Sequence, residues 1–425
     1  MFLGILFILA SILFGLAVLT YLRVKFCVEE QISIAIPIGL ITSTLLTYLV
    51  SYSQKNLNFT IISLMTIFLI IISLAIFKRQ DKLNKTLFSS KRSRELSLVA
   101  LAGTLAFLVL NVNSILRPTP YGLASTEFGG GDLSFHISVI NSFVFRSNFP
   151  PHYPVMINTP MKYPVPADFL SSILITSGFD LRSSIIIPNL LFQVALFCLI
   201  ASLAIRLTRK KYVGIFSAFM MFFAGNMGII FALEDVFRSG DVITWISKLP
   251  TDYAGSGISS LPGLYFGNPV SVMLMPQRSS IMGMSIALIV YILMIHVLKK
   301  DGQLRELILA GVLTGILPTV HTHSFIAVAM VLVGFIIIFK KNWRFFVLLF
   351  LPIILLALPQ LLNIQTQVSN DFFGFSAGWL GSANTTLQVY PYTILNILAS
   401  VFVLPIPMET AMPVHFFTVR CIRHP

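Results

Sequence analysis

The sequence has little charge, few cysteines and no recognisable nucleotide-binding motif. Charged residues make up 11% of its 425 positions and hydrophobic residues 56%, whereas a soluble protein carries about 25% charged residues. This composition excludes a soluble globular enzyme, and the high apolar content excludes a disordered chain. The three cysteines, Cys27, Cys198 and Cys421, lie far apart, so the sequence contains neither a disulfide framework nor a CxxC metal motif.

The sequence also lacks the motifs of several membrane and soluble machines. It has no glycine-rich phosphate loop, no GxGxxG after a strand and no GxSxG elbow, so nucleotide-driven transport is unsupported. It has no arginine-rich helix or selectivity-filter signature, which argues against a channel. The net charge of +13 does not indicate a nucleic-acid partner, because the basic residues cluster between apolar spans, where they fix membrane orientation.

What the sequence does contain is a series of apolar runs close to the length of about 20 residues that crosses a bilayer. We predict an all-α polytopic membrane protein with about 10–11 transmembrane helices and long outer loops that carry short amphipathic helices. A segment at 167–179 is too short to span and is predicted to be re-entrant. The predicted spans are 2–22, 32–52, 57–77, 96–116, 183–205, 212–233, 279–298, 306–320, 324–339, 345–363 and 386–405.

The distribution of charge predicts the orientation of these spans. With the loop 78–96 in the cytoplasm and each span crossing once, the cytoplasmic side holds 19 Lys and Arg against 6 Asp and Glu. The outer side then holds 8 against 9, which satisfies the positive-inside rule. The outer loops are long and rich in Pro, Gly and Tyr, as functional loops often are. We therefore expect a multi-pass protein of the plasma membrane with its active face outward.

The same pattern divides the chain into three predicted parts. Residues 1–95 form an N-terminal three-helix transmembrane segment with a basic cytoplasmic loop. Residues 96–405 form a transmembrane domain with the outer loops 117–166 and 234–278. Residues 406–425 form an atypical tail that resembles neither a span nor an ordered domain, as in a truncated chain.

The first candidate site is Asp132 with His136. Three glycines precede Asp132, which is predicted to begin an amphipathic helix in the outer interface, and His136 follows four residues later on the same face. The loop then continues through Tyr163 and Asp168 in a Pro-rich stretch that suits a binding loop over a polar cleft. The alternative is that Asp132 only caps a helix and that His136 is a surface residue.

The second and third candidates lie at the same predicted depth. Arg278 opens a span that ends near Lys299, so that a helix N-terminus, hydroxyls and a guanidinium would form a phosphate site; the alternative is a snorkelling arginine. His321 and His323 would lie just below the outer surface, where they could bind a metal or a phosphate or move protons. Their alternative is a hydrogen-bonded turn.

A further pair, Glu234 and Asp235, opens the second outer loop directly after a predicted span. Adjacent carboxylates at that position could hold a divalent cation such as Mg²⁺ or Mn²⁺. The alternative is that they are solvated charges at a helix end. No other cofactor is indicated by the sequence.

At these residues the chain resembles the GT-C superfamily of integral-membrane glycosyltransferases, whose members include oligosaccharyltransferases and mannosyltransferases. These proteins place an acidic residue in the first large outer loop, and Asp132-Leu-Ser-Phe-His136 is similar to their Asp-x-x-x-His pattern. The Pro-rich turn with Tyr163-Pro164 and the short helix with Asp168 follow in the same order, over about residues 110–340. Three additional spans before residue 96 depart from the family, and the lack of a WWD-type motif disfavours its peptide-glycosylating branch.

The resemblance implies transfer of a sugar from a polyprenyl-phosphate-linked donor to a glycan, lipid or protein acceptor, within membrane lipids. Asp132 would be the general base or would position the acceptor, with His136 beside it. The implied substrate-binding residues are Arg278, His321 and His323 for the lipid phosphate, together with Tyr163 and Asp168; Glu234 and Asp235 would hold a metal.

Two other functions remain open from the residues alone. A transporter or flippase of a lipid-linked or anionic solute would have charged residues deep in several spans and helices broken at mid-depth. A non-catalytic membrane scaffold would need no site. For an enzyme we expect Asp132, Arg278 and His321 to converge in one outward cavity, because catalysis requires near-contact geometry.

Overall fold

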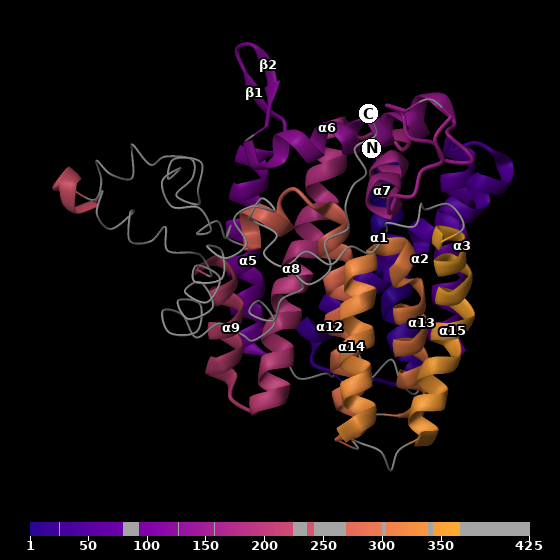
Figure 1. The fold of residues 1–425 in the computed structure, drawn as a ribbon, viewed down its shortest axis with the longest axis vertical. Coiled ribbons are helices and arrows are strands. Elements are labelled where there is room, and N and C mark those ends of the chain that lie inside the picture. Colours follow the sequence, from indigo (N-terminus) through magenta and orange to yellow (C-terminus); the bar gives the residue numbers. More distant parts are fainter. Residues whose placement is uncertain are drawn as a thin grey trace, which may run out of the picture. The chain divides into compact units, whose positions relative to one another are not determined.

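The structure is a computed structural model and is mostly helical (Figure 1). It describes residues 1–24, 26–79, 93–125, 127–156, 158–223, 236–241, 269–299, 303–338 and 343–365. Glu234, Asp235, the predicted span 386–405 and the tail 406–425 lie outside these residues. The elements are α1 (Phe2–Leu22), α2 (Val28–Gln54), α3 (Phe59–Arg79), α5 (Arg94–Ser114), β1 (Arg117–Thr119), β2 (Gly122–Ala124), α6 (Glu127–Arg146), α7 (Pro166–Thr176), α8 (Leu181–Thr208), α9 (Lys211–Phe223), the π-helical turn η1 (Val270–Leu274), α12 (Arg278–Leu298), α13 (Leu304–Val320), α14 (Thr322–Ile338) and α15 (Trp343–Gln365).

Seven of the described helices are long and apolar enough to cross a membrane, so the chain is a multi-pass helical membrane protein. They are α1, α2, α3, α5, α8, α12 and the stretch Phe345–Leu362 of α15. The predicted span 306–320 lies in α13, and the described parts of the predicted spans 212–233 and 324–339 lie in α9 and α14. The prediction of an all-α chain missed one antiparallel hairpin, in which β1 pairs with β2 directly after α5.

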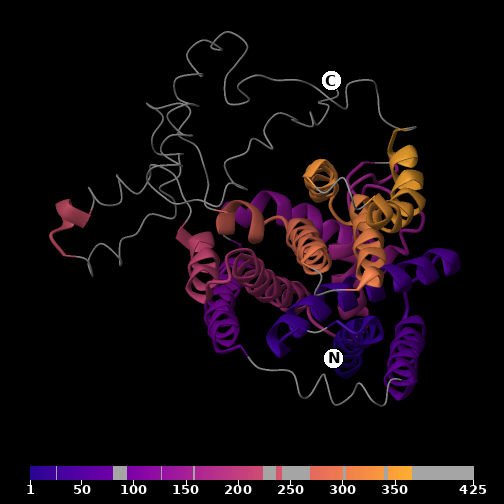
Figure 2. The same cartoon turned by 90° about the horizontal axis from the view of Figure 1, so that it is seen from below.

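The chain forms two compact units, and most described elements belong to the unit made of Met1–Ala218 and Met273–Ile364. Within this unit α12 is central, because 89% of its apolar stretch is buried. It packs against α8, α13, α14, α2 and α7 (Figures 1 and 2). α1 packs against both α2 and α3, and α2 also packs against α8.

Small residues allow α1 and α2 to approach closely. A Cβ placed on Gly15 would collide with the carbonyl of Ala35, and one placed on Gly39 would collide with the carbonyl of Ser11. At the same crossing the hydroxyls of Ser11 and Ser43 lie 2.6 Å apart and hydrogen bond. Close backbone approach and polar contacts of this kind hold helices together in membranes, where lipid removes the hydrophobic driving force.

One end of this unit carries Arg206, Lys299 and Arg305, and we call it the basic end. Glu30 near the start of α2 accepts two hydrogen bonds of 2.6 Å from Arg206 near the end of α8. Lys299 after α12 donates to the carbonyl of Arg206, and Arg305 in α13 donates to the carbonyl of Tyr21 at 2.9 Å. The ends that meet here are those that the predicted alternation places on one side of the membrane.

The other end of the unit carries α6 and α7 (Figure 1), and we call it the α7 end. The amino group of Met1 donates to the carbonyl of Ser177, directly after α7, at 2.6 Å. α7 has 11 residues, or about 16 Å of helix at 1.5 Å per residue, so it is too short to span. Pro166 lies in its first turn, where proline is tolerated.

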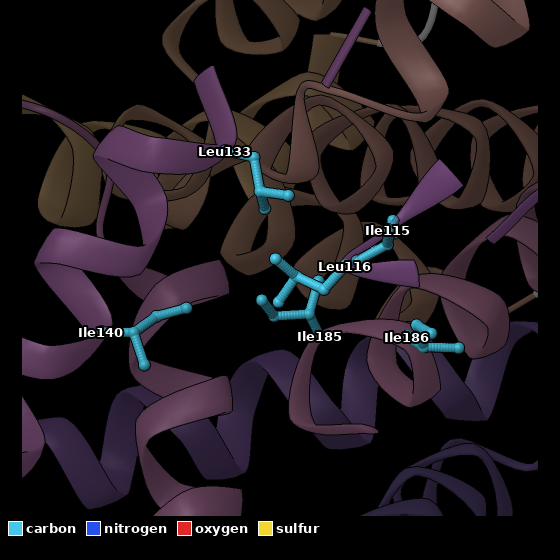
Figure 3. Packing of buried hydrophobic residues seen from close by; sticks show 6 residues of the cluster. All are labelled: Ile115, Leu116, Leu133, Ile140, Ile185 and Ile186. Carbon is cyan, nitrogen blue, oxygen red and sulfur yellow. The ribbon is translucent and has the colours of Figure 1, made fainter. Parts of the chain in front are cut away.

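The amphipathic pattern of α6 is used for packing against protein. Its residues Leu133 and Ile140 join Ile115 and Leu116 after α5, and Ile185 and Ile186 of α8, in one buried cluster (Figure 3). Figure 3 shows these side chains gathered between α6 and the start of α8. The apolar face of this helix thus packs against α8 and the turn after α5, and its position in the outer interface stays a prediction.

Candidate functional site

A fully buried carboxylate forms the centre of the site at the α7 end. Asp168 lies in the first turn of α7 and has no exposed surface. Its two oxygens lie 3.0 and 2.9 Å from Nδ1 of His136 on α6. Its Oδ1 also accepts a hydrogen bond of 2.9 Å from the guanidinium of Arg278, the first residue of α12. Three separate elements thus meet at one carboxylate.

The guanidinium of Arg278 is held on several sides. It is 2% exposed and donates from Nε to Oδ1 of Asn189 at 3.2 Å and from a terminal nitrogen to the hydroxyl of Ser171 at 2.6 Å. Ser171 in turn donates to the carbonyl of Ser184 at 2.6 Å. A buried charge with a counter-ion and fixed acceptors is tolerable where a lone one would not be. Because Asp168 offsets its charge, Arg278 is not a free cation.

Aromatic rings surround the imidazole of His136, which is 1% exposed. The ring of Tyr163 lies 5.7 Å from it in an edge-on arrangement, and the ring of Phe135 lies 5.8 Å from it. The hydroxyl of Tyr163 also lies 3.4 Å from the hydroxyl of Ser279, the second residue of α12. Tyr163 therefore links α6 to the start of α12.

The phenol of Tyr163 is sensitive to the charges around it. Burial is the largest cause that raises its pKa, and the negative charges of Asp168 and Asp132 raise it further. The hydrogen bond with Ser279 and the positive charge of Arg278 lower the pKa in part. Both carboxylates and the guanidinium therefore act on the pKa of this one phenol.

A second arm of the site begins at Ser280. Its hydroxyl lies 3.2 Å from Nε2 of His321, in the turn between α13 and α14, and Nδ1 of His321 lies 2.8 Å from the hydroxyl of Ser324. Burial, with a smaller contribution from His323, lowers the pKa of His321 to about 4, so its imidazole is neutral at pH 7. This turn approaches α12 at Gly283, where a Cβ would collide with His321.

A small cavity adjoins Arg278. It is lined by Leu133, Ile185, Asn189 and Arg278 together with Ser114, Ile115, Met275 and Pro276. The Nδ2 atom of Asn189 is buried without a hydrogen-bond partner among the described residues, so one donor at this cavity is unused. Neither Asp132 nor His321 lines it, so the cavity is not the common one expected for all three residues.

The structure separates the first predicted pair. α6 begins at Glu127, so Asp132 lies inside the helix, and the predicted helix start at Asp132 is wrong. Asp132 is exposed and makes no hydrogen bond to a described residue, whereas His136 one turn later is buried. The two side chains are therefore not presented together, although both lie near Tyr163.

Among the other predicted residues, Arg278 and Asp168 form an ion pair with each other. His321 is buried and hydrogen bonds with Ser280. His323 is exposed, and its ring lies 5.3 Å from the ring of His321. Glu234 and Asp235, predicted to hold a metal, lie outside the described residues. Within the described part of the chain, no group of three or more His, Cys, Asp or Glu side chains is arranged to hold a metal ion.

Sequence reasoning missed the neutral partners of Arg278. Ser171 lies three residues after Asp168, on the same face of α7, and this spacing could have indicated it. Asn189, a polar residue inside the apolar run of α8, could have been recognised by its depth. The sequence predicted the hydroxyls at this helix start, those of Ser279 and Ser280, only as part of a phosphate site. Their contacts with Tyr163 and His321 have no local signal in the sequence.

Comparisons with protein-family models, with curated proteins and with solved structures find no match to this chain.

Proposed function

We propose that the chain is a membrane glycosyltransferase that moves a sugar from a polyprenyl-phosphate-linked donor to an acceptor hydroxyl or amide. The observation that supports it most is the meeting of His136, Asp168, Tyr163, Arg278 and His321 at the α7 end. These residues come from four segments far apart in the chain. The donor is already activated, so such a transfer needs no nucleotide-binding domain.

The chemistry requires a group that takes a proton from the acceptor and groups that stabilise the departing phosphate. Asp132 and His136 are the candidate proton acceptors near Tyr163. Because Asp168 offsets Arg278, the phosphate would meet hydrogen-bond donors: the hydroxyls at the start of α12 and the exposed imidazole of His323. Gln277 makes no side-chain cap at this helix start, which leaves backbone N–H groups for an anion.

The positions of the buried charges favour an enzyme over a transporter. Among the described residues, Asp168 and Arg278 lie at the α7 end, and Glu30 and Glu306 lie at the basic end, where Arg206 and His296 pair with them. Between these ends the buried side-chain contacts of the described residues are neutral, as between Asn111 and Gln193 and between Ser11 and Ser43, each at 2.6 Å. A transporter would be expected to carry charges at mid-depth.

The test is sugar transfer in membranes supplied with labelled polyprenyl-phosphate sugars of several kinds. Wild type and Asp132→Asn would be compared at matched expression, with Glu95→Gln as a control at the basic end. We expect transfer by wild type and by Glu95→Gln, and a loss in Asp132→Asn, whether Asp132 is the base or positions the acceptor. Absence of transfer by the wild type with every donor would refute the proposal and favour transport of a lipid-linked solute.

The same transfer assay, run with and without a chelator, would test whether the reaction needs the proposed divalent cation. The proposal also includes the plasma membrane as the location and the outer face as the active face. Accessibility of a cysteine introduced at the exposed Tyr121 of the hairpin to an impermeant thiol reagent in intact cells would test the orientation.

A further inference from the structure

We propose that His136, oriented by Asp168, is the base that deprotonates the acceptor, and that Asp132 positions the acceptor at the entrance. This inference rests on the proposed function and assigns the roles within its site. The resemblance left Asp132 either as the base or as the carboxylate that positions the acceptor, and the inference assigns it the second role. Four features of the structure support it. They are the tautomer of His136, the ionised Asp168 beside it, the absence of a described partner for Nε2 of His136, and the exposure of Asp132.

The contact with Asp168 determines which nitrogen of His136 carries the proton. Both oxygens of Asp168 lie within 3.0 Å of Nδ1, and an ionised carboxylate can only accept hydrogen bonds. Nδ1 must therefore carry the proton, so that in the neutral ring Nε2 carries the lone pair. This is the tautomer that a base acting through Nε2 requires.

Two features keep Asp168 ionised. The guanidinium of Arg278 donates to it at 2.9 Å, and arginine is charged under all ordinary conditions. Asp168 also lies in the first turn of α7, where the helix dipole favours a negative charge. The carboxylate is thus available to stabilise the positive charge that appears on the imidazole when Nε2 takes a proton.

Nε2 of His136 makes no hydrogen bond to any residue that the structure describes, whereas Nδ1 is engaged. The charged and titratable groups next to the imidazole are Asp168 on α7, which Arg278 of α12 contacts in turn, and Tyr163 in the loop before α7. The acceptor approaches past Tyr163, whose 3.4 Å hydrogen bond to Ser279 is long enough to be exchanged for one with a substrate hydroxyl.

In the proposed transfer step, the acceptor oxygen forms a bond to the anomeric carbon of the sugar while its proton moves to Nε2 of His136. The bond between that carbon and the phosphate oxygen breaks, and its electron pair leaves with the lipid phosphate. The imidazolium is held by Asp168 and later returns its proton to the departing phosphate or to water.

Asp132 is less suited to be the base because it is exposed. Water solvates its carboxylate, and no described residue orients it by a hydrogen bond, whereas Asp168 orients His136 and can stabilise the proton that His136 gains. Its exposed position near Tyr163 does allow it to accept a hydrogen bond from the incoming acceptor. Asp132→Asn should therefore raise KM more than it lowers kcat, and the opposite should hold for His136.

The test replaces His136 and restores a base from solution. His136→Gln and His136→Ala would be assayed for sugar transfer beside His152→Gln, which changes a histidine of the neighbouring loop that contacts the carbonyl of Pro150. We expect kcat to fall by about 10²–10⁴-fold in both His136 variants, as for loss of a general base, and to be unchanged in His152→Gln. Imidazole should restore transfer to His136→Ala, and 1,2,4-triazole, of the same size but much less basic, should not.

Equal rescue by imidazole and triazole would show that His136 only fills space and would overturn the proposal, as would near wild-type kcat in His136→Gln. If both variants fail to fold, Asp132→Asn still decides, because a lower kcat at an unchanged KM would make Asp132 the base and overturn the proposal. Failure of the wild type to transfer any sugar would instead refute the proposed function.

Discussion

Replacement of Asp168 by asparagine is expected to destabilise the protein strongly, because it leaves a buried cation without its counter-ion. Asp168 is 0% and Arg278 2% exposed, and their atoms lie 2.9 Å apart. Removing one partner of a buried pair costs about 3–5 kcal/mol, whereas replacing both can be nearly neutral. The remaining partners of Arg278, Ser171 and Asn189, are neutral and cannot offset its charge.

The measurement is a double-mutant cycle in detergent micelles, with Asp168→Asn, Arg278→Gln and the double variant. The free energy of unfolding would be obtained from denaturant titration, and the folded fraction checked by size-exclusion chromatography. We expect Asp168→Asn to lose about 3–5 kcal/mol. The double variant should lose less than the sum of the single ones, because neither charge then remains alone. Glu95→Gln, which breaks the exposed pair with Lys211, serves as a control and should leave stability unchanged.

Two results would contradict this reasoning. A loss below about 1 kcal/mol, the size typical of exposed pairs, would mean that water reaches Arg278. Additive single losses in the cycle would mean that the two side chains do not act as a pair, although they lie within contact distance.

Two further predictions concern the helix crossing and a thiol. Gly39→Ala should lower stability by at least about 1–3 kcal/mol through overpacking, because its Cβ would meet the carbonyl of Ser11. Gly334→Ala, which has open space around it, should not; equal thermal midpoints for the two variants would refute the close crossing. Burial, and then the charge of Glu30, raises the pKa of the Cys27 thiol to about 12, so at pH 8 it is protonated and nearly unreactive. Its alkylation, followed by peptide mass spectrometry, should accelerate as the pH rises toward that value and on unfolding; fast labelling at pH 8 in the folded protein would contradict this.

Much of the helical framework could be predicted from the sequence because its signals are local. The predicted spans 2–22 and 279–298 correspond to α1 (Phe2–Leu22) and α12 (Arg278–Leu298), within one residue at each end. Apolar length and flanking charge are sufficient to locate these two helices, because each helix in a membrane satisfies its own backbone hydrogen bonds. The start of α6 was predicted five residues late, because three consecutive glycines indicated a loop where the chain continues as helix.

The candidate site was predicted in part. Chemistry-bearing residues at predicted helix starts and in the Pro-rich loop indicated His136, Asp168, Tyr163 and Arg278 as separate candidates, whereas the residues expected to converge were Asp132, Arg278 and His321. Their pairing could not be predicted, because the hydrogen bond between His136 and Asp168 spans 32 positions and that between Asp168 and Arg278 spans 110. Which carboxylate is buried also depends on this packing: Asp132 and Asp168 differ little in local pattern and lie at opposite extremes of exposure.

The sequence by itself determined that this is a helical protein of the membrane, which stretches form its long apolar helices, and which helix ends share a side, because these follow from local apolar length and charge. Only the tertiary structure decided that the charge of Arg278 is offset by Asp168 and that His136 has one nitrogen engaged and the other without a described partner. The physical reason is that a buried charge or imidazole acquires its properties from its contacts, and here those contacts come from α6, α7, α8 and α12, which only the folded chain brings together.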